Sequence, residues 1–354
     1  MLFALGSNGS GQLGLGHDED VSTPQCVLPN TLDQDPSSTI KRLAAGGNHT
    51  VVLYSNGRAF TSGDNSDGRC ATNGIGPLGE FREIASPGSS VAQSWEDVAA
   101  TWSATILTRD QGREVWVCGA GGSGELGLGE GLLEARQLTR VPDFPPEGTQ
   151  VLQLAACMAH VVAVLTNGQV WGWGKGRKGQ LGEVAQDTWT PRRIDGATFK
   201  VSRAVCGKDF TCLSGDRETG DLAMLGPNGR DRFNIKAKAP SEVPGWEDIS
   251  SSWGNVFVSR DTGRLTAWGR DDHGQLPPDE LPSIAKVAAG SEHCLALTVD
   301  GKVMAWGWGE HGNCGEQIDE KCDVKGKWNE LVVPGKVTGI FAGCATSFIS
   351  TVDT

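Results

Sequence analysis

A motif of fixed internal spacing recurs along the whole chain and limits what it can fold into. Each copy reads Gly, four variable residues, Gly, a polar residue, and then Leu, Cys or Phe. A degraded copy runs from Gly226 to Phe233. The intact copies begin at Gly6, Gly63, Gly119, Gly174, Gly269 and Gly307. A period of about fifty residues indicates a repeat architecture, in which each unit stacks on its neighbours to bury its apolar face.

Hairpin signals precede most copies of this motif. Residues 161–171 and 295–306 are two examples, each with an apolar run, Asn-Gly or Asp-Gly, and a second apolar run. These dipeptides favour tight β-hairpins because glycine accepts a positive φ. The last hairpin lacks its second strand, whereas the chain begins in mid-repeat. We therefore predict an all-β fold over residues 1–354, a single seven-bladed β-propeller in which residues 1–8 complete the blade formed by 337–354.

Composition narrows the classes of partner. The formal net charge is −12 and no Lys/Arg run occurs, which argues against a direct nucleic-acid partner. No apolar run approaches the length of a membrane span, so we expect no membrane partner. The ten cysteines include no C-x-x-C pair. We interpret them as reduced thiols of an intracellular chain.

Several short motifs imitate catalytic or ligand sites. Three G-x-G-x-x-G matches recur in step with the repeat and lead into turns, not into the helix that a dinucleotide site requires. His49, His160 and His293 occupy one equivalent position of three repeats, so a ring would hold them apart. Each could hydrogen-bond a loop or contact a partner. We expect no cofactor, no metal, no catalytic residue and no enzyme. An enzyme that acts at the channel mouth is a competing class, because catalytic groups can assemble in space from distant parts of the sequence.

Comparison of equivalent repeat positions predicts a binding surface. The residues two positions before the histidine position in the seven repeats are Gly47, Trp102, Met158, Lys208, Trp253, Ser291 and Cys344. The position between them holds Asn48, Ser103, Ala159, Asp209, Gly254, Glu292 and Ala345. If the blades are equivalent, each set forms a ring at one rim of the channel. The Trp and charged members of these sets are candidate anchors for a partner. The alternative is that the Trp side chains plug the mouth of the channel.

One glycine-bounded loop differs from the others, which are mostly small and polar. It contains Trp308, Glu310 and His311, and turn formation explains none of these three side chains. A charged insertion, residues 316–331, follows in a blade that is otherwise complete. We interpret the insertion either as a solvated loop or as a lip beside the binding site.

The repeat resembles that of the regulator of chromosome condensation superfamily. Its Gly-x-x-His, Leu-Thr-x-x-Gly, Trp-Gly and Gly-Gln-Leu-Gly elements cover the whole chain. Several longer strings are more specific and resemble the fungal alpha-tubulin suppressor, or killer-toxin-insensitivity, propellers. These strings lie at residues 6–9, 12–20, 23–25, 46–49, 207–210, 290–293, 306–315 and 343–346. Superfamily membership implies a propeller but no single function.

The closer resemblance implies a non-enzymatic scaffold. Proteins of that family form a heterodimer with a small CSL-type zinc-finger metalloprotein that carries electrons. Through it they support diphthamide biosynthesis on elongation factor two and Elongator-dependent modification of tRNA wobble uridines, in the cytoplasm and nucleus. Contact with Elongator and the diphthamide enzymes would be indirect. The competing class is a guanine-nucleotide exchange factor for a small GTPase, as in the superfamily's founding member. We predict these partner-binding residues: Asn48, His49, Trp102, Lys208, Asp209, Trp253, Glu292, His293, Trp308, Glu310 and His311.

Overall fold

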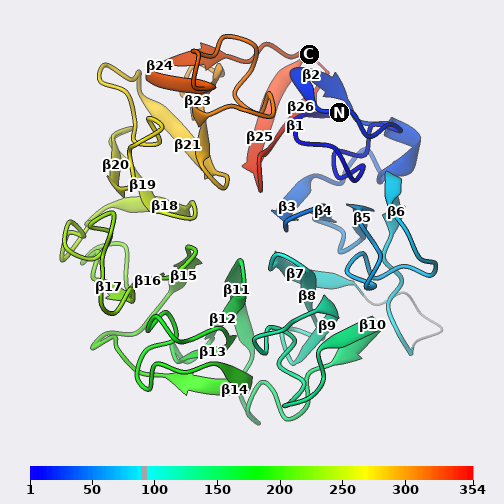
Figure 1. Cartoon of the computed structure of the whole chain (residues 1–354), viewed down its shortest axis with the longest axis vertical. Helices are drawn as coiled ribbons and strands as arrows, with labels where there is room; N and C mark the ends of the chain where they lie inside the picture. Colours follow the sequence, from blue (N-terminus) through cyan, green and yellow to red (C-terminus); the bar gives the residue numbers. More distant parts are fainter. Residues whose placement is uncertain (89–93, 354) are drawn as a thin grey trace.

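Seven antiparallel sheets form a ring in a computed structural model that describes residues 1–88 and 94–353. Figure 1 views the ring along its shortest axis and shows the sheets as blades arranged around a common axis. Five sheets have four strands and two have three. The strands are connected in chain order from the innermost outward, except in the sheet that contains both ends of the chain. The prediction of a seven-bladed propeller is confirmed.

We number the blades in chain order. The first three comprise β3 (Ile40–Ala45), β4 (His49–Tyr54), β5 (Ala59–Gly63) and β6 (Leu78–Glu83); β7 (Trp95–Ala100), β8 (Ala104–Arg109), β9 (Glu114–Ala120) and β10 (Glu134–Arg140); and β11 (Val151–Cys157), β12 (His160–Leu165), β13 (Val170–Gly174) and β14 (Thr188–Ile194). The remaining four comprise β15 (Arg203–Cys206), β16 (Thr211–Ser214) and β17 (Leu222–Leu225); β18 (Trp246–Ser251), β19 (Asn255–Arg260) and β20 (Leu265–Gly269); β21 (Ile284–Ala289), β22 (His293–Thr298), β23 (Val303–Trp308) and β24 (Asp323–Glu330); and β25 (Lys336–Ala342), β26 (Thr346–Val352), β1 (Leu2–Gly6) and β2 (Val21–Cys26). A short 3-10 helix, η1 (Pro29–Thr31), follows β2.

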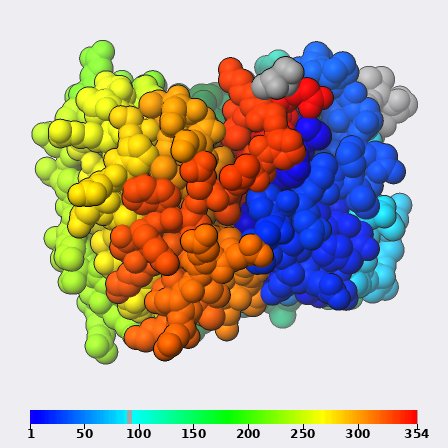
Figure 2. All heavy atoms as spheres, turned by 90° about the horizontal axis from the view of Figure 1, so that it is seen from above, coloured from blue at the N-terminus to red at the C-terminus, as the bar shows by residue number. Residues whose placement is uncertain are grey.

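The N-terminal strand closes the ring. β1 lies between β26 and β2, with Leu2 opposite Ser350 and Gly6 opposite Thr346. Figure 2 shows the red C-terminal segment beside the dark blue N-terminal one. The predicted closure is therefore confirmed. Because β1 is a central strand of blade 7, both of its edges are hydrogen-bonded, and the N-terminus does not offer an open edge.

The apolar core lies largely between neighbouring blades. One cluster joins Phe257 of blade 5, Trp306 of blade 6 and Leu5 of blade 7. All three side chains are at most 1% exposed. Burial of a large apolar side chain stabilises the fold by roughly 1.5–3 kcal/mol, so these contacts hold adjacent blades together.

The repeat glycines permit close backbone approaches. Gly63 has φ +109°, and a Cβ atom on it would lie 2.3 Å from the carbonyl oxygen of Asn48. Gly68 has φ +84°, and a Cβ there would lie 2.4 Å from the carbonyl oxygen of Arg136 in blade 2. Gly63 thus lets β5 approach the β3–β4 loop of its own blade. Gly68 lets the β5–β6 loop approach blade 2.

Two neighbouring blades lack a fourth strand in the described part of the chain. After β17, residues 226–245 are irregular, with turns at several places and one isolated bridge between Asp221 and Glu242. After β20, residues 270–283 are also irregular. Blades 4 and 5 therefore differ from the rest of the ring. None of the helical segments among residues 1–88 and 94–353 has the length and apolar character needed to cross a membrane.

The charged insertion is not what the sequence indicated. Residues 323–330 of the 316–331 segment form β24, the fourth strand of blade 6, and pair with β23. The expectation that the whole insertion is either a solvated loop or a lip is wrong, because its second half completes the blade. The register of β23 with β24 shifts between Ala305, which faces Asn329, and Gly307, which faces Val324.

Candidate functional site

Two sets of loops lie at the same end of the propeller. The loops from first to second strands carry the ring positions compared in the sequence, and the glycine-bounded loops follow the third strands. Backbone hydrogen bonds join the two sets: Trp308 N donates to Glu292 O at 2.9 Å, and Asp64 N donates to Asn48 O at 2.8 Å. We call this end the mouth face. The sequence predicted two rings but not that they share one face.

Backbone hydrogen bonds join most neighbouring loops of the inner ring, which consists of the loops between first and second strands. Neighbouring blades are linked where Gly47 N donates to Trp102 O at 2.9 Å and Trp102 N donates to Met158 O at 2.7 Å. Further round, Trp253 N donates to Ser291 O at 3.0 Å. Six of the seven residues compared at this position line one pocket: Gly47, Trp102, Met158, Trp253, Ser291 and Cys344. The inferred ring at the channel rim is therefore present.

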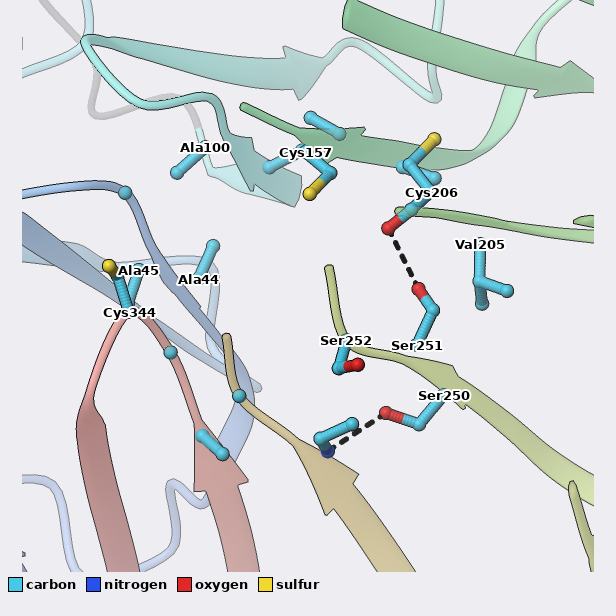
Figure 3. A pocket seen from close by; sticks show the side chains of 18 of the residues that line it. Ala44, Ala45, Ala100, Cys157, Val205, Cys206, Ser250, Ser251, Ser252 and Cys344 are labelled. Atoms are coloured by element: carbon cyan, nitrogen blue, oxygen red, sulfur yellow. Dashed lines mark hydrogen bonds between the residues drawn. The ribbon is translucent and has the colours of Figure 1, made fainter. Parts of the chain in front are cut away.

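The pocket behind this ring is the mouth of the central channel. Figure 3 shows small side chains around it, among them Ala44, Ala45 and Ala100. Ser251 Oγ donates to the carbonyl oxygen of Cys206 at 2.8 Å and ties two inner strands together. The lining offers small and weakly polar groups, and its thiols form no disulfide in the described part of the chain.

Two tryptophans from different blades meet at this mouth. The ring centroids of Trp102, in blade 2, and Trp253, in blade 5, are 6.1 Å apart at an interplanar angle of 42°. Trp253 is half-buried, whereas 39% of Trp102 stays exposed. The indoles therefore cover part of the channel and also present an apolar surface to solvent. A plug and a partner anchor are compatible in this geometry.

The ring histidines are structural. His49 and His293 are each 1% exposed, so neither side chain can touch a partner, and their assignment to the binding surface is wrong. Nε2 of His49 lies 3.0 Å from Oγ1 of Thr105 in the next blade, and that hydroxyl donates to Arg69 O at 2.7 Å. Because the hydroxyl proton is used, His49 must donate from Nε2. His160 makes the equivalent contact with Thr211 at 3.1 Å.

Burial also sets the charge state of these histidines. It lowers the pKa of His49 to about 3 and the pKa of His160 and His293 to about 4. All three side chains are therefore neutral at pH 7 and link adjacent blades without adding charge to the mouth face.

Glu292 is likewise removed from direct contact. Only 4% of it is exposed, and it forms an ion pair with Arg270 of blade 5. Its second oxygen accepts a hydrogen bond from Gln275 Nε2 at 2.8 Å. Burial raises the pKa of this carboxyl group. Its expected role as a partner contact is therefore wrong, and its observed role is to hold Arg270.

Four predicted residues surround one groove of the mouth face. Lys208, Asp209, Trp253 and Glu292 line it together with residues that the sequence comparison did not single out. The Nζ atom of Lys208 lies 5.6 Å from the centre of the Trp253 ring, a cation–π distance. Asp209 lies 3.7 Å from Lys175 Nζ. Sequence reasoning missed Arg230, Arg232, Phe233 and Arg270, although Arg232 and Phe233 stand in the degraded repeat copy.

The remaining predicted residues lie further out. Trp308 stacks on His273 of blade 5, with ring centroids 5.3 Å apart at 24°. His311 Nδ1 lies 2.8 Å from Asp20 Oδ2, which belongs to the β1–β2 loop of blade 7. Glu310 is exposed, and Asn48 is half-buried. Trp308 and His311 thus join neighbouring blades at the outer ring, and only part of each side chain is available to a partner.

The described residues contain no group of three or more His, Cys, Asp or Glu side chains placed to hold a metal ion. What the mouth face offers is a rigid backbone ring, exposed aromatic surface and a charged groove. These features are typical of protein recognition.

The fold and this face define a class: seven-bladed propellers that display their loop rings at one end. The chain belongs to the RCC1-like domain family, which matches residues 1–349. It is 32% identical over 363 residues to an RCC1 repeat-containing protein of Schizosaccharomyces pombe, covering 99% of this chain and 98% of that one. It is 30% identical over 401 residues to the secretion-regulating guanine nucleotide exchange factor of Bos taurus, covering 97% of this chain and 81% of that one.

A solved structure supports the fold independently. Prp20p of Saccharomyces cerevisiae superposes with a TM-score of 0.82 over 100% of this chain and 91% of its own. At 19% identity this likeness shows the architecture alone.

Proposed function

We propose that this protein acts as a guanine nucleotide exchange factor for a small GTPase, bound at the mouth face. The observation that carries the proposal is the similarity to the bovine exchange factor, which extends over 97% of the chain. The shared region includes the mouth-face loops, because they occur in every blade.

Exchange requires binding energy, and no covalent step. A factor that binds the nucleotide-free GTPase more tightly than the loaded form lowers the GTPase's affinity for nucleotide by the same ratio, since the coupling between the two sites is reciprocal. A ring whose loops are hydrogen-bonded from blade to blade suits this task. It presents Trp102 and Lys208 on a surface that does not need to be ordered on binding.

A nucleotide-release assay tests this function. The purified protein is added to a Ran-like GTPase loaded with a fluorescent GDP analogue, and release is followed after excess GTP. We expect faster release, because a coupling of about 1–3 kcal/mol lowers the GTPase's affinity for nucleotide about 5- to 150-fold. Trp102→Ala should reduce the acceleration, whereas Val299→Ala, in a hairpin turn at the opposite end of the blades, should not. Unchanged release across a panel of small GTPases would refute exchange activity.

A second candidate rests on the string from Trp306 to Gly315. We keep the hypothesis that the protein is a scaffold for a small CSL-type metalloprotein and thereby supports diphthamide synthesis and tRNA wobble modification in the cytoplasm and nucleus. The supporting observation is that Glu310 is exposed and that Trp308 and His311 stay partly accessible in the outer ring. In this hypothesis the metal stays with the partner.

Affinity purification separates the two candidates. A scaffold should retain a protein of about a hundred residues or fewer in one-to-one ratio, with iron or zinc detected by metal analysis. Replacement of Trp308 and His311 by Ala should weaken that complex by at least about tenfold in Kd, as expected for two interface anchors. A complex that carries a GTPase and no metal would reject this hypothesis.

A further inference from the structure

An irregular segment of blade 4 builds one wall of the charged groove. Residues 226–240 follow β17, at the place where the five four-stranded blades form their fourth strand. The Asp231 carboxylate accepts backbone hydrogen bonds from Ile235 at 2.8 Å and from Lys236 and Ala237 at 3.0 Å. These bonds fix the turn and engage the one acidic side chain of residues 230–238. Asp231 forms no ion pair with the neighbouring cations in the described part of the chain.

Cationic side chains gather around this turn. Five exposed ones form no ion pair with any residue that the structure describes: Lys208, Arg230, Arg232, Lys236 and Lys238. Elsewhere on the chain, most arginines are paired with carboxylates. A concentration of unpaired positive charge is unexpected on a protein of net charge −12. Such charges repel one another, so their proximity costs stability unless a ligand compensates it.

The floor of the groove is aromatic and is held in place. The guanidinium carbons of Arg232 and Arg270 lie 5.1 Å and 5.0 Å from the centre of the Phe233 ring. Arg270 is fixed in turn by Asp272 and by the buried Glu292. Trp253 forms the inner side, towards the channel mouth. The groove thus combines exposed cations at its edge with the aromatic rings of Phe233 and Trp253.

We propose that this groove docks an acidic segment of a protein partner, with Asp or Glu side chains paired to Lys208, Arg230 and Arg232 and an apolar side chain on Phe233. Arginine forks match carboxylates in a bidentate geometry, which favours this occupant. A nucleic acid is disfavoured because the rest of the chain is strongly acidic and would repel a long polyanion. The docking groove is a separate proposal from nucleotide exchange and does not require it.

Fluorescence anisotropy tests the groove directly. The probe is a fluorescein-labelled twelve-residue peptide with Asp and Glu around one central Phe, titrated with the full chain in 50 mM NaCl. We expect saturable binding that weakens at least about threefold in 300 mM NaCl, because screening shortens the reach of charge pairing. A neutral peptide with Asn in place of every Asp and Gln in place of every Glu should lose this binding, because it cannot pair with the cations.

Matched variants localise the binding. Arg230→Glu combined with Arg232→Glu should weaken the peptide at least about tenfold, and Arg230→Gln combined with Arg232→Gln should weaken it less. The control, Arg82→Glu combined with Lys327→Glu, alters the net charge equally at two exposed positions in other blades. Urea unfolding checks that each variant is folded. Equal loss in variant and control would overturn the proposal as non-specific attraction. Tighter, groove-dependent binding of a labelled single-stranded oligonucleotide would overturn it in favour of a nucleic-acid site.

Discussion

Leu5→Ala tests whether the N-terminal strand stabilises the ring. Leu5 lies in β1 between β26 and β2, none of its surface is exposed, and it belongs to the core cluster that joins blades 5, 6 and 7. Loss of a fully buried leucine side chain costs about 2–5 kcal/mol, part from lost burial and part from the cavity left behind. Typical domains have a free energy of unfolding of only about 5–15 kcal/mol. One truncation in β1 should therefore remove a substantial fraction of it.

Urea unfolding followed by tryptophan fluorescence measures this loss, since the chain has twelve Trp residues. The control is Val352→Ala at the end of β26, because Val352 is 46% exposed. Its free energy of unfolding should differ from that of the parent chain by no more than about 0.5 kcal/mol. Where both variants show the same slope of unfolding free energy against urea concentration, a shift of the midpoint reports a change in stability. A loss below about 1 kcal/mol in Leu5→Ala would refute the argument that β1 is packed as a central strand.

Three further perturbations probe the ring. Deletion of residues 1–6 removes β1 itself and should abolish the cooperative urea transition; a transition at the original midpoint would contradict the closure. Gly63→Ala should destabilise the fold by about 1–3 kcal/mol, because φ is +109° and a Cβ would lie 2.3 Å from Asn48 O, and thermal unfolding measures it. The pKa of His160 is lowered to about 4 by burial, so the unfolded chain binds the proton first as pH falls. The contribution of neutral His160 to the free energy of unfolding is complete above about pH 6.5 and is lost as the pH falls to about 4. The loss amounts to about 1.4 kcal/mol per unit of pKa shift. His160→Asn, the residue that blade 5 carries at this position, should therefore lose less stability than the parent chain between pH 7 and pH 4.5; an unchanged pH dependence would show that His160 is not buried neutral.

The architecture could be predicted because the repeat marks backbone requirements. Gly63 and its equivalents stand where a Cβ would meet a carbonyl oxygen, so the motif reports geometry that every blade shares. The ring of Gly47, Trp102, Met158 and their equivalents follows from the same logic, since equivalent positions of a closed ring must lie at one rim. Closure by β1 followed from the unpaired strand at each end of the chain.

The side-chain environment could not be predicted by the same route. Glu292 is buried because Arg270, in the neighbouring blade, neutralises it, and sequence spacing does not reveal contacts between blades. Trp308 meets His273 for the same reason. His49 illustrates a different difficulty: a ring position at the start of a strand can point into the interface between blades as readily as towards solvent. The missing fourth strands of blades 4 and 5 also left no positive signal, because irregular segments lack a period.

In a ring of near-equivalent blades, features present in every blade support the scaffold, and a single partner must be recognised by what differs between blades. The differences at the mouth face are not spread evenly. Lys208, Trp253, Arg270 and Trp308 all belong to blades 4, 5 and 6, and the basic turn at residues 230–238 belongs to blade 4. Contacts connect them: Lys208 with Trp253, Arg270 with Glu292, and His273 with Trp308. We infer that a partner docks off the propeller axis, across these three blades, and that Trp102 extends its footprint to the channel mouth. Substitutions at residues 64–67, in the glycine-bounded loop of blade 1, should therefore affect binding less than equal substitutions in the same loop of blade 5.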